Sequence, residues 1–154
     1  MFIIANHISW IDILALGGAT GTAFVAHDGI ARWPVIGWLA AQNNTLFIAR
    51  DRRSALSGQI DGLRAAMAGH QPVALFPEGT TSDGTVLLPF KSSLLAAAET
   101  LPPGVAVQPV LLDYAGAADI AWVGDERGLA NFLRILARLR PVRLTLHFLP
   151  ALEG

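Results

Sequence analysis

The chain contains no cysteine. This excludes disulfide bonds, thiolate metal sites and a cysteine nucleophile, and it leaves the redox compartment open. Charged residues are few, at 15% of 154 residues, and the formal net charge of -1 gives no basic field of the kind that binds nucleic acid. The four histidines are scattered along the chain, without the close helical pairs that build zinc sites. We therefore expect no metal site and no nucleic-acid partner.

Long apolar runs are also lacking. The longest uncharged windows, residues 13–26 and 33–49, are interrupted by polar residues or glycine and fall short of the span of about 20 residues that crosses a membrane. No signal peptide is visible, because Met1 is followed at once by an apolar strand and a polar motif. Yet hydrophobic residues make up 53% of the chain, and the mean hydropathy is +0.47. We expect apolar surface beyond the core, suited to a membrane surface or a lipid ligand.

Short apolar runs alternate with helical patterns along the whole chain. This alternation is typical of an α/β fold with a mostly parallel central sheet flanked by helices, and the length fits one domain over residues 1–154. We expect strands at residues 2–5, 22–26, 46–49, 73–76, 105–112 and 142–149. We expect helices from residue 9 onward and at residues 35–42, 54–68, 92–100 and about 129–139, with a surface loop at 114–125.

The last predicted helix carries two kinds of side chain. Its apolar residues fall on one side, with Arg134 and Arg138 on the polar side; the apolar set is Leu129, Phe132, Leu133, Leu136 and Leu139. Five of the eleven basic residues lie between positions 127 and 143. These charges form either a solvated face or a patch for anionic lipid headgroups.

A polar cluster, Asn6-His7-Ile8-Ser9-Trp10-Ile11-Asp12, directly follows the first apolar run. A carboxylate bonded to one nitrogen of His7 would leave the other nitrogen as a general base, so we interpret His7 and Asp12 as a candidate catalytic pair. Two structural alternatives stay open. A lone histidine is more often structural than catalytic, and Ser9 can cap a helix while Asp12 reaches back three positions, as in a capping box.

Two further clusters are candidates for binding. Arg50, at the end of the third predicted strand, is placed to clamp a phosphate or carboxylate, whereas Arg52 and Arg53 beside Asp51 suit a solvated loop equally well. The turn-rich segment 77–84 follows the fourth predicted strand, and its amides and hydroxyls could hold a polar headgroup. Since loops that leave the carboxyl ends of parallel strands carry ligands, we expect His7 and this loop to face one cleft.

Together these residues resemble the glycerolipid acyltransferases of the lysophosphatidic acid acyltransferase family. His7 to Asp12 looks like the family's His-x4-Asp motif in the setting Asn-His-x-Ser-x-x-Asp. Residues 46–50 look like its Phe-Ile-x-Arg block, residues 76–80 match Phe-Pro-Glu-Gly-Thr, and residues 107–110 match the apolar-x-Pro block. One His-x4-Asp alone is weak, but four blocks in this order across residues 6–110 are a specific match.

The resemblance implies transfer of a fatty acyl group from a coenzyme A or acyl carrier protein thioester to a lysolipid hydroxyl. His7 would take the proton from that hydroxyl and Asp12 would support the imidazolium, with no acyl-enzyme and no metal or organic cofactor. The resemblance also implies that the matching positions of the four blocks, with two residues that follow the third block, bind substrate: Asn6, Ser9, Phe47, Arg50, Glu78, Gly79, Thr80, Thr81, Lys91 and Pro109.

Two positions depart from family members that use lysophosphatidate. Those members usually have arginine after Glu-Gly-Thr, where this chain has Thr81, and many have a lysine where this chain has His27. Each lost cation removes a charge-assisted contact to phosphate worth about 1.5 to 3 kcal/mol. The segment 78–84, followed by Leu-Pro-Phe-Lys-Ser-Ser, looks like the branch that acylates lyso-ornithine lipids, whose acceptors lack a phosphate. Arg50 and Lys91 remain as candidate phosphate ligands.

Family members commonly carry a membrane-anchoring segment before the histidine block, whereas only five residues precede Asn6 here. We expect a single domain that lacks this anchor, or a fragment, acting as a peripheral protein on the cytoplasmic face of a membrane, the inner membrane in a bacterium. Two other functions fit the same residues. One is a lipid-binding module without catalysis, and the other is a hydrolase in which His7 activates water on the thioester.

Overall fold

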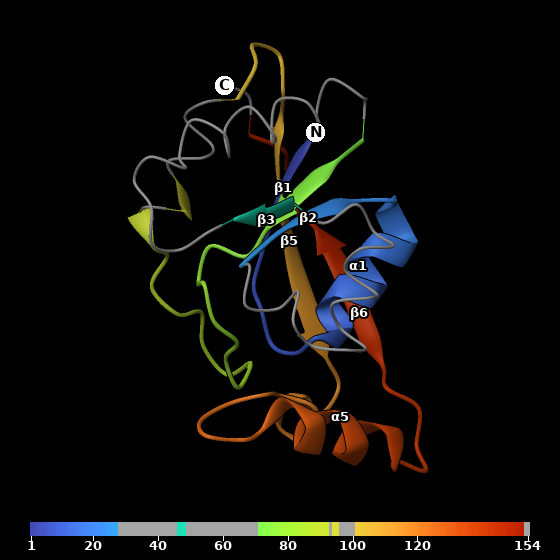
Figure 1. Cartoon of the computed structure of the whole chain (residues 1–154). Helices are drawn as coiled ribbons and strands as arrows, with labels where there is room; N and C mark the ends of the chain where they lie inside the picture. Colours follow the sequence, from blue (N-terminus) through green and yellow to red (C-terminus); the bar gives the residue numbers. More distant parts are fainter. Residues whose placement is uncertain (28–45, 49–70, 93, 96–100, 153–154) are drawn as a thin grey trace.

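The computed structural model describes residues 1–27, 46–48, 71–92, 94–95 and 101–152 (Figure 1). Its centre is a six-stranded sheet in the order β3-β2-β4-β1-β5-β6. All strand pairs are parallel except β5 with β6, which is antiparallel. The strands are β1 (Phe2–Ala5), β2 (Ala23–His27), β3 (Leu46–Ile48), β4 (Val73–Leu75), β5 (Val107–Tyr114) and β6 (Leu144–Phe148). The predicted α/β fold with a mostly parallel sheet is confirmed.

Strand β1 lies in the middle of the sheet and is buried on both faces. Phe2 is in register with Val73 of β4 on one side and with Val107 of β5 on the other. Because side chains alternate along a strand, Phe2 packs with one apolar cluster and Ile3 with another, larger one. The larger cluster also holds residues of helix α1 (Ile11–Thr20). Such burial explains why β1 is apolar at every position rather than alternating.

The carboxyl ends of β1 and β4 are neighbours in the sheet. The chain leaves β1 through α1 toward β2 on one side, while β5 lies on the other side of β1. In parallel sheets, ligands bind outside the carboxyl ends of the strands, at the place where the connections from adjacent strands run to opposite sides. Helix α5 (Gly128–Leu136) crosses this end of the sheet, beyond the end of β5 (Figure 1). The loops that follow β1 and β4 therefore lie together near α5.

Helix α1 begins at Ile11 rather than at Ser9, and no side chain caps it. The prediction of a capping box is half right. The Asp12 carboxylate does accept a hydrogen bond from the Ser9 amide at 3.0 Å, but the buried Ser9 hydroxyl has no hydrogen-bond partner among the described residues. The reason is a turn ahead of the helix, in which the Asp12 amide donates to the Ser9 carbonyl at 3.1 Å. The helix ends at Gly21, whose φ of 66° is favourable for glycine.

The prediction of a surface loop at 114–125 is wrong at three buried residues, Tyr114, Ile120 and Ala121, whereas most of the other residues of the segment are exposed. Tyr114 is the last residue of β5 and is buried, because β5 runs two residues beyond the prediction and pairs with the start of β6. A short 3-10 helix follows (η3, Ala117–Asp119), and Ile120 and Ala121 behind it are also buried. These three residues therefore belong to the core at the end of the sheet that carries His7.

Helix α5 confirms the predicted last helix. Unlike a helix that packs its apolar side against the core, it leaves most of that side exposed. Its buried residues are Gly128, Asn131 and Ile135, whereas the leucines of the apolar side are exposed. Asn131 replaces an apolar contact with hydrogen bonds, accepting from the Trp10 indole at 3.1 Å and donating to the Ala121 carbonyl at 3.1 Å. The helix is thus held to the site end of the sheet through a polar residue.

Several predictions fall on residues outside the described ranges. These are the helices at 35–42 and 54–68, the part of the 92–100 helix beyond residue 95, and Arg50. None of the helices that the structure describes combines the length and the hydropathy of a membrane-spanning segment.

Candidate active site

His7 lies in the loop directly after β1, with its imidazole held from two directions. Its Nδ1 lies 2.8 Å from Asp12 Oδ2. Its ring stacks on Phe76, with centroids 4.1 Å apart and planes 12° apart. The side chain keeps 17% of its surface exposed, while Asp12 is fully buried. His7 is therefore a fixed but accessible imidazole.

The Asp12 carboxylate is saturated with donors. Its Oδ2 accepts from the amides of Ile8 at 2.6 Å and Ser9 at 3.0 Å, besides the imidazole of His7. Its Oδ1 accepts from the hydroxyl of Tyr114. Since an ionised carboxylate only accepts, Nδ1 of His7 carries the proton and Nε2 is left with its lone pair. One oxygen of Asp12, Oδ2, therefore fills both of its expected roles: it accepts from the Ser9 amide ahead of the helix, and it holds the His7 imidazole.

Tyr114 is a residue of this site that the sequence pattern did not reveal. The pattern places it at the start of a surface loop, yet it is buried and its hydroxyl donates to Asp12. Burial raises the pKa of Tyr114 well above its ordinary value of 10.0, and the adjacent Asp12 charge raises it further, so the phenol keeps its proton. A signal was present: Val110, Leu112 and Tyr114 alternate along one strand, and Tyr114 is the only tyrosine in the chain.

Glu78 joins the two loops that we expected to meet. It is 1% exposed, and its carboxylate accepts from the His7 amide at 2.8 Å and from the Leu88 amide at 2.8 Å. The expectation that the His7 and Glu78 loops lie together is confirmed. Both carboxylate oxygens are occupied by backbone donors, so Glu78 fixes the His7 backbone; its predicted role in substrate binding stays a prediction.

The loop after β4 also holds the His7 segment through its hydroxyl residues. The Ser82 amide donates to the His7 carbonyl at 2.8 Å, so both backbone groups of His7 are bonded to this loop. The Thr81 hydroxyl donates to the carbonyl of Trp122, whose own amide donates to the Ile8 carbonyl at 3.0 Å. Thr81 therefore ties the loop to the segment that follows β5.

Asn6 has a structural contact of its own. Its amide nitrogen donates to the Leu112 carbonyl at 3.1 Å, and its amide oxygen accepts from the Leu112 amide at 2.7 Å. The side chain continues the β1–β5 pairing for one more residue beyond Ala5. Asn6 thereby sets where β1 ends and where His7 begins, and its role in substrate binding stays a prediction, as does that of the buried Ser9.

The other predicted binding residues lie around the same loop or on β5. Gly79 and Thr80 are exposed, and the Lys91 ammonium lies 3.5 Å from the Gly79 carbonyl. Gly79 has φ +67°, and a Cβ there would come within 2.8 Å of Lys91 Nζ. Pro109 is half-buried on β5, in register with Ile4 of β1. Phe47 lies on β3, and Arg50 is outside the described residues.

No group of three or more metal-ligating side chains occurs in the part of the chain that the structure describes. The side chains that the structure does assemble here provide an oriented imidazole. A buried carboxylate holds one ring nitrogen, and the other nitrogen can accept a proton from a hydroxyl brought to it.

Comparison with known proteins agrees with the geometry. An acyltransferase family profile matches residues 1–113. The chain is 36% identical to a lyso-ornithine lipid O-acyltransferase of Rhizobium meliloti over 147 residues, which is 86% of this chain and 50% of that protein. It is 35% identical to a 1-acyl-sn-glycerol-3-phosphate acyltransferase of Neisseria gonorrhoeae over 114 residues, 74% of this chain and 44% of that protein. The chain thus spans about half the length of these curated relatives.

A solved structure shares the fold. The 1-acyl-sn-glycerophosphate acyltransferase PlsC from Thermotoga maritima matches with a TM-score of 0.61 at 23% sequence identity. The match covers 99% of this chain and 55% of that one. At this identity the likeness supports the architecture alone.

Proposed function

Because the chain belongs to the acyltransferase family, we propose that it moves a fatty acyl group from a thioester to the free hydroxyl of a lysolipid. The observation that carries this proposal is the 2.8 Å contact between His7 Nδ1 and Asp12 Oδ2. It orients the imidazole and leaves Nε2 as the base.

In the proposed reaction, Nε2 of His7 removes the proton of the lysolipid hydroxyl as that oxygen attacks the thioester carbonyl. The Asp12 carboxylate stabilises the imidazolium that forms. Collapse of the tetrahedral intermediate forms the new ester and breaks the carbon–sulfur bond. The proton on Nε2 then passes to the departing sulfur, which leaves as a thiol. The imidazole is restored and no acyl-enzyme is formed.

The acceptor that we favour is a lysolipid with a headgroup less anionic than that of lysophosphatidate, such as lyso-ornithine lipid. The R. meliloti relative is a lyso-ornithine lipid O-acyltransferase, and Thr81 stands where lysophosphatidate enzymes of the family usually have arginine. The Thr81 hydroxyl is bonded to the Trp122 carbonyl and so serves the fold instead of offering a cation. Lys91 is a cation next to the exposed Gly79 and is, with Arg50, a candidate contact for any phosphate that does bind.

The donor that we propose is acyl-CoA or an acyl carrier protein thioester, used without a metal or organic cofactor. The acyl donor is bound to a carrier and the lysolipid acceptor to a membrane, so we propose a peripheral location on the cytoplasmic face of a membrane. The excess of apolar residues over charged ones supports this placement.

The test is an acyl-transfer assay with labelled acyl thioester and a panel of lysolipids, comparing wild type with His7→Ala and Asp12→Asn. Transfer by wild type with loss of about 100-fold or more in His7→Ala is expected for a general base. Thioester consumption at full rate without acceptor would identify a hydrolase instead. Lipid binding with no transfer at all would identify a binding module.

The acceptor preference is tested in the same assay. Purified protein should turn over lyso-ornithine lipid faster than lysophosphatidate at equal concentration. Equal or faster turnover of lysophosphatidate would refute the preference while leaving the acyl transfer itself intact.

A further inference from the structure

Helix α5 presents a stripe of leucines to solvent. Leu129, Leu133 and Leu136 are 66%, 55% and 60% exposed, and Leu139, just beyond the helix, is fully exposed. The first three are spaced four and three residues apart, so they lie along one side of the helix. Single exposed leucines are ordinary, but a contiguous stripe of them marks an interaction surface.

The polar residues of α5 are used to hold the helix to the protein. Arg134 donates to Glu126 at 2.8 Å and to the Ala121 carbonyl at 3.0 Å. The hydrogen bond from Arg134 to the Glu126 carboxylate lowers the pKa of Glu126. Asn131 donates to the other oxygen of Glu126 at 2.9 Å. An ordinary surface helix buries its apolar side and turns its polar side to water. Here polar groups anchor the helix, and the leucines are left facing away.

The segment that carries the leucine stripe is rich in basic residues. Between residues 117 and 143 the chain has five arginines and three acidic residues, although the whole chain has a net charge of -1. Arg134 and Arg138 are paired with Glu126 and Asp119. The other three arginines, Arg127, Arg140 and Arg143, are exposed and make no ion pair with any residue in the described ranges.

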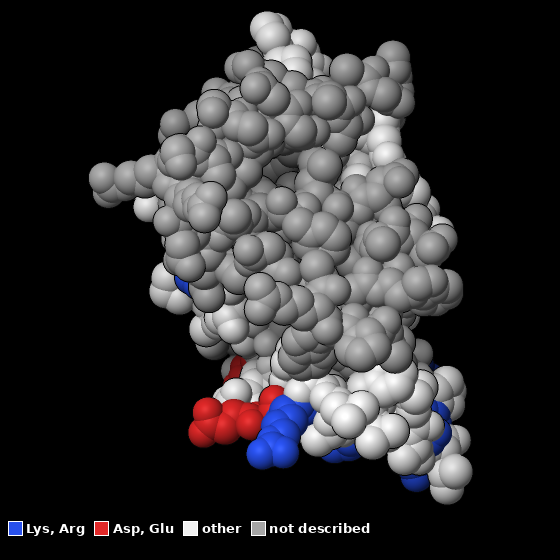
Figure 2. Space-filling view, in the orientation of Figure 1, with Lys and Arg blue, Asp and Glu red and all other residues white. Residues whose placement is uncertain are grey.

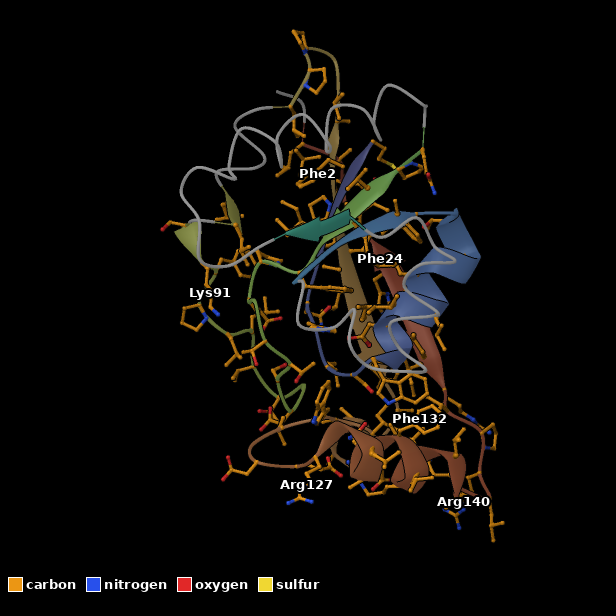
Figure 3. All side chains as sticks on the ribbon, viewed as in Figure 1. Phe2, Phe24, Lys91, Arg127, Phe132 and Arg140 are labelled. Atoms are coloured by element: carbon orange, nitrogen blue, oxygen red, sulfur yellow. The ribbon has the colours of Figure 1, made fainter. Side chains whose placement is uncertain are left out.

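Two of these three arginines can be placed at the ends of the helix. Figure 3 shows Arg127 and Arg140 at opposite ends of α5, on the side away from the sheet, whereas Phe132 points toward α1. Phe132 and Trp10 lie with ring centroids 5.2 Å apart, in agreement with this view. In Figure 2 most of the basic side chains on the described part of this face gather at the same lower end, with acidic ones at one edge.

We propose that the leucine stripe of α5 and its three unpaired arginines form a docking surface for an anionic lipid membrane. The leucines would enter the boundary between headgroups and acyl chains while the arginines contact lipid phosphates. This inference rests on the proposed function, because a lysolipid acceptor is presented at such a surface. The surface is also close to the chemistry: Asn131 of α5 bonds Trp10, three residues after His7.

A second copy of this chain is a poorer occupant. A symmetric dimer through α5 would place the same patch on both subunits, so three unpaired arginines of each copy would face those of the other. Like charges brought together at an interface oppose association. An anionic membrane instead complements the charge of the whole patch.

The experiment is co-sedimentation with vesicles of phosphatidylcholine containing phosphatidylglycerol, and with vesicles of phosphatidylcholine alone. One variant combines Leu129→Gln, Leu133→Gln and Leu136→Gln, and a second combines Arg127→Gln, Arg140→Gln and Arg143→Gln. Leu152→Gln is the matched control, because Leu152 is 59% exposed but pairs with Val107 at the opposite end of β5.

The leucine variant should bind both kinds of vesicle at least about tenfold more weakly, since it removes the apolar contribution. The arginine variant should bind anionic vesicles about 100-fold more weakly, because each arginine contributes about fivefold to the affinity. Its affinity for neutral vesicles should change little. The Leu152→Gln control should bind like wild type. Wild-type binding by the leucine variant, or equal losses in the control, would overturn the proposal.

Two further measurements distinguish a membrane from a second copy of the chain and from a contact within the protein. If sedimentation velocity shows that the leucine variant breaks a wild-type dimer without weakening vesicle binding, the occupant is a second copy and the proposal is wrong. If thermal melting shows that the variant unfolds, the leucines are covered within the protein and the proposal is again wrong.

Transfer to a short-chain lysolipid dispersed without vesicles should be unchanged in the leucine variant. Failure of wild type to transfer there would refute the proposed function but not the docking surface.

Discussion

Replacing Tyr114 with phenylalanine removes one hydroxyl and keeps the ring. That hydroxyl donates to Asp12 Oδ1, the carboxylate oxygen that does not face His7. Tyr114 touches neither His7 nor a substrate group in the proposed reaction, so it is a positioning residue that acts through Asp12. The substitution tests whether the buried end of the Asp12 carboxylate matters to the imidazole at its other end.

The size of the effect follows from the burial of both partners. A hydrogen bond to a charged group contributes about 1.5 to 3 kcal/mol, and Asp12 is fully buried, so no water replaces the lost donor. For a chain of 154 residues, a loss of about 2 kcal/mol lowers the melting temperature by about 4 to 8 °C. We also expect a fall of about tenfold in kcat, equivalent to about 1.4 kcal/mol of transition-state stabilisation.

The pH dependence distinguishes positioning from a simple loss of stability. A carboxylate with one donor fewer attracts the His7 imidazolium more strongly. The acidic limb of the kcat/KM profile should therefore move to higher pH in Tyr114→Phe, a shift that lowered stability alone would not cause. The assay is acyl transfer over a pH series, with Leu111→Ala as a control on the same strand, since Leu111 is 40% exposed and its side chain points away from the core.

Alkaline stability gives a second readout from the same residue. Burial, and then the Asp12 charge, raise the pKa of Tyr114 above 10.0 in the folded protein, whereas the phenol of the unfolded chain ionises at about its ordinary value. The unfolded state alone then gains from ionisation, so stability is fully present below about pH 10 and falls above it by about 1.4 kcal/mol per pH unit. Because Tyr114 is the only tyrosine, tyrosinate absorbance should appear together with unfolding and not before it.

Three results would refute this reasoning. They are an unchanged melting temperature in Tyr114→Phe, an unmoved acidic limb, and tyrosinate formation in protein that remains folded by circular dichroism. Any of them would mean that the hydroxyl does not hold the Asp12 carboxylate.

The other predictions concern the residues that fix His7 and the acceptor. Glu78→Ala should lower kcat by about tenfold or more and Glu78→Gln by less, because the amide keeps an oxygen acceptor for the His7 N–H; equal kcat in all three proteins would contradict this. Asn6→Ala should lower the free energy of unfolding by about 2 kcal/mol, measured by urea titration, since two hydrogen bonds to Leu112 are lost; an unchanged midpoint would show that they contribute nothing. Thr81→Arg should raise the ratio of lysophosphatidate to lyso-ornithine lipid turnover by about tenfold in the panel assay, because it adds a charge-assisted phosphate contact; a constant ratio would remove Thr81 from acceptor selection.

Local sequence patterns predicted the strands well, because buried parallel strands read as short apolar runs. Phe2–Ala5 is found as predicted, and the other strands shift by a residue or two at their ends. We expected the His7 and Glu78 loops to lie together, since both leave the carboxyl ends of parallel strands, and the structure confirms it through the hydrogen bond between them. The sequence could not show that both carboxylate oxygens of Glu78 accept hydrogen bonds from backbone amides, because residue type alone does not distinguish a ligand contact from a structural one.

Long-range contacts explain one error, at Tyr114, and one feature that the sequence left open, the orientation of α5. Tyr114 lies 102 positions from Asp12, and only the pairing of β1 with β5 brings it to the carboxylate. The faces of α5 could not be oriented either, because an apolar stripe is normally assigned to the core. Here the hydrogen bonds of Asn131 hold a different side of the helix against the protein.

The most direct test of the central claim, that His7 held by Asp12 is the base for acyl transfer to a lysolipid, is the rate of labelled product formation by His7→Ala beside wild type. The measurement uses saturating thioester and lyso-ornithine lipid, with circular dichroism to show that the variant is folded. We predict product formation by wild type and a rate lower by about 100-fold to 10,000-fold in the variant. A folded His7→Ala protein that acylates the lysolipid at the wild-type rate would contradict the claim.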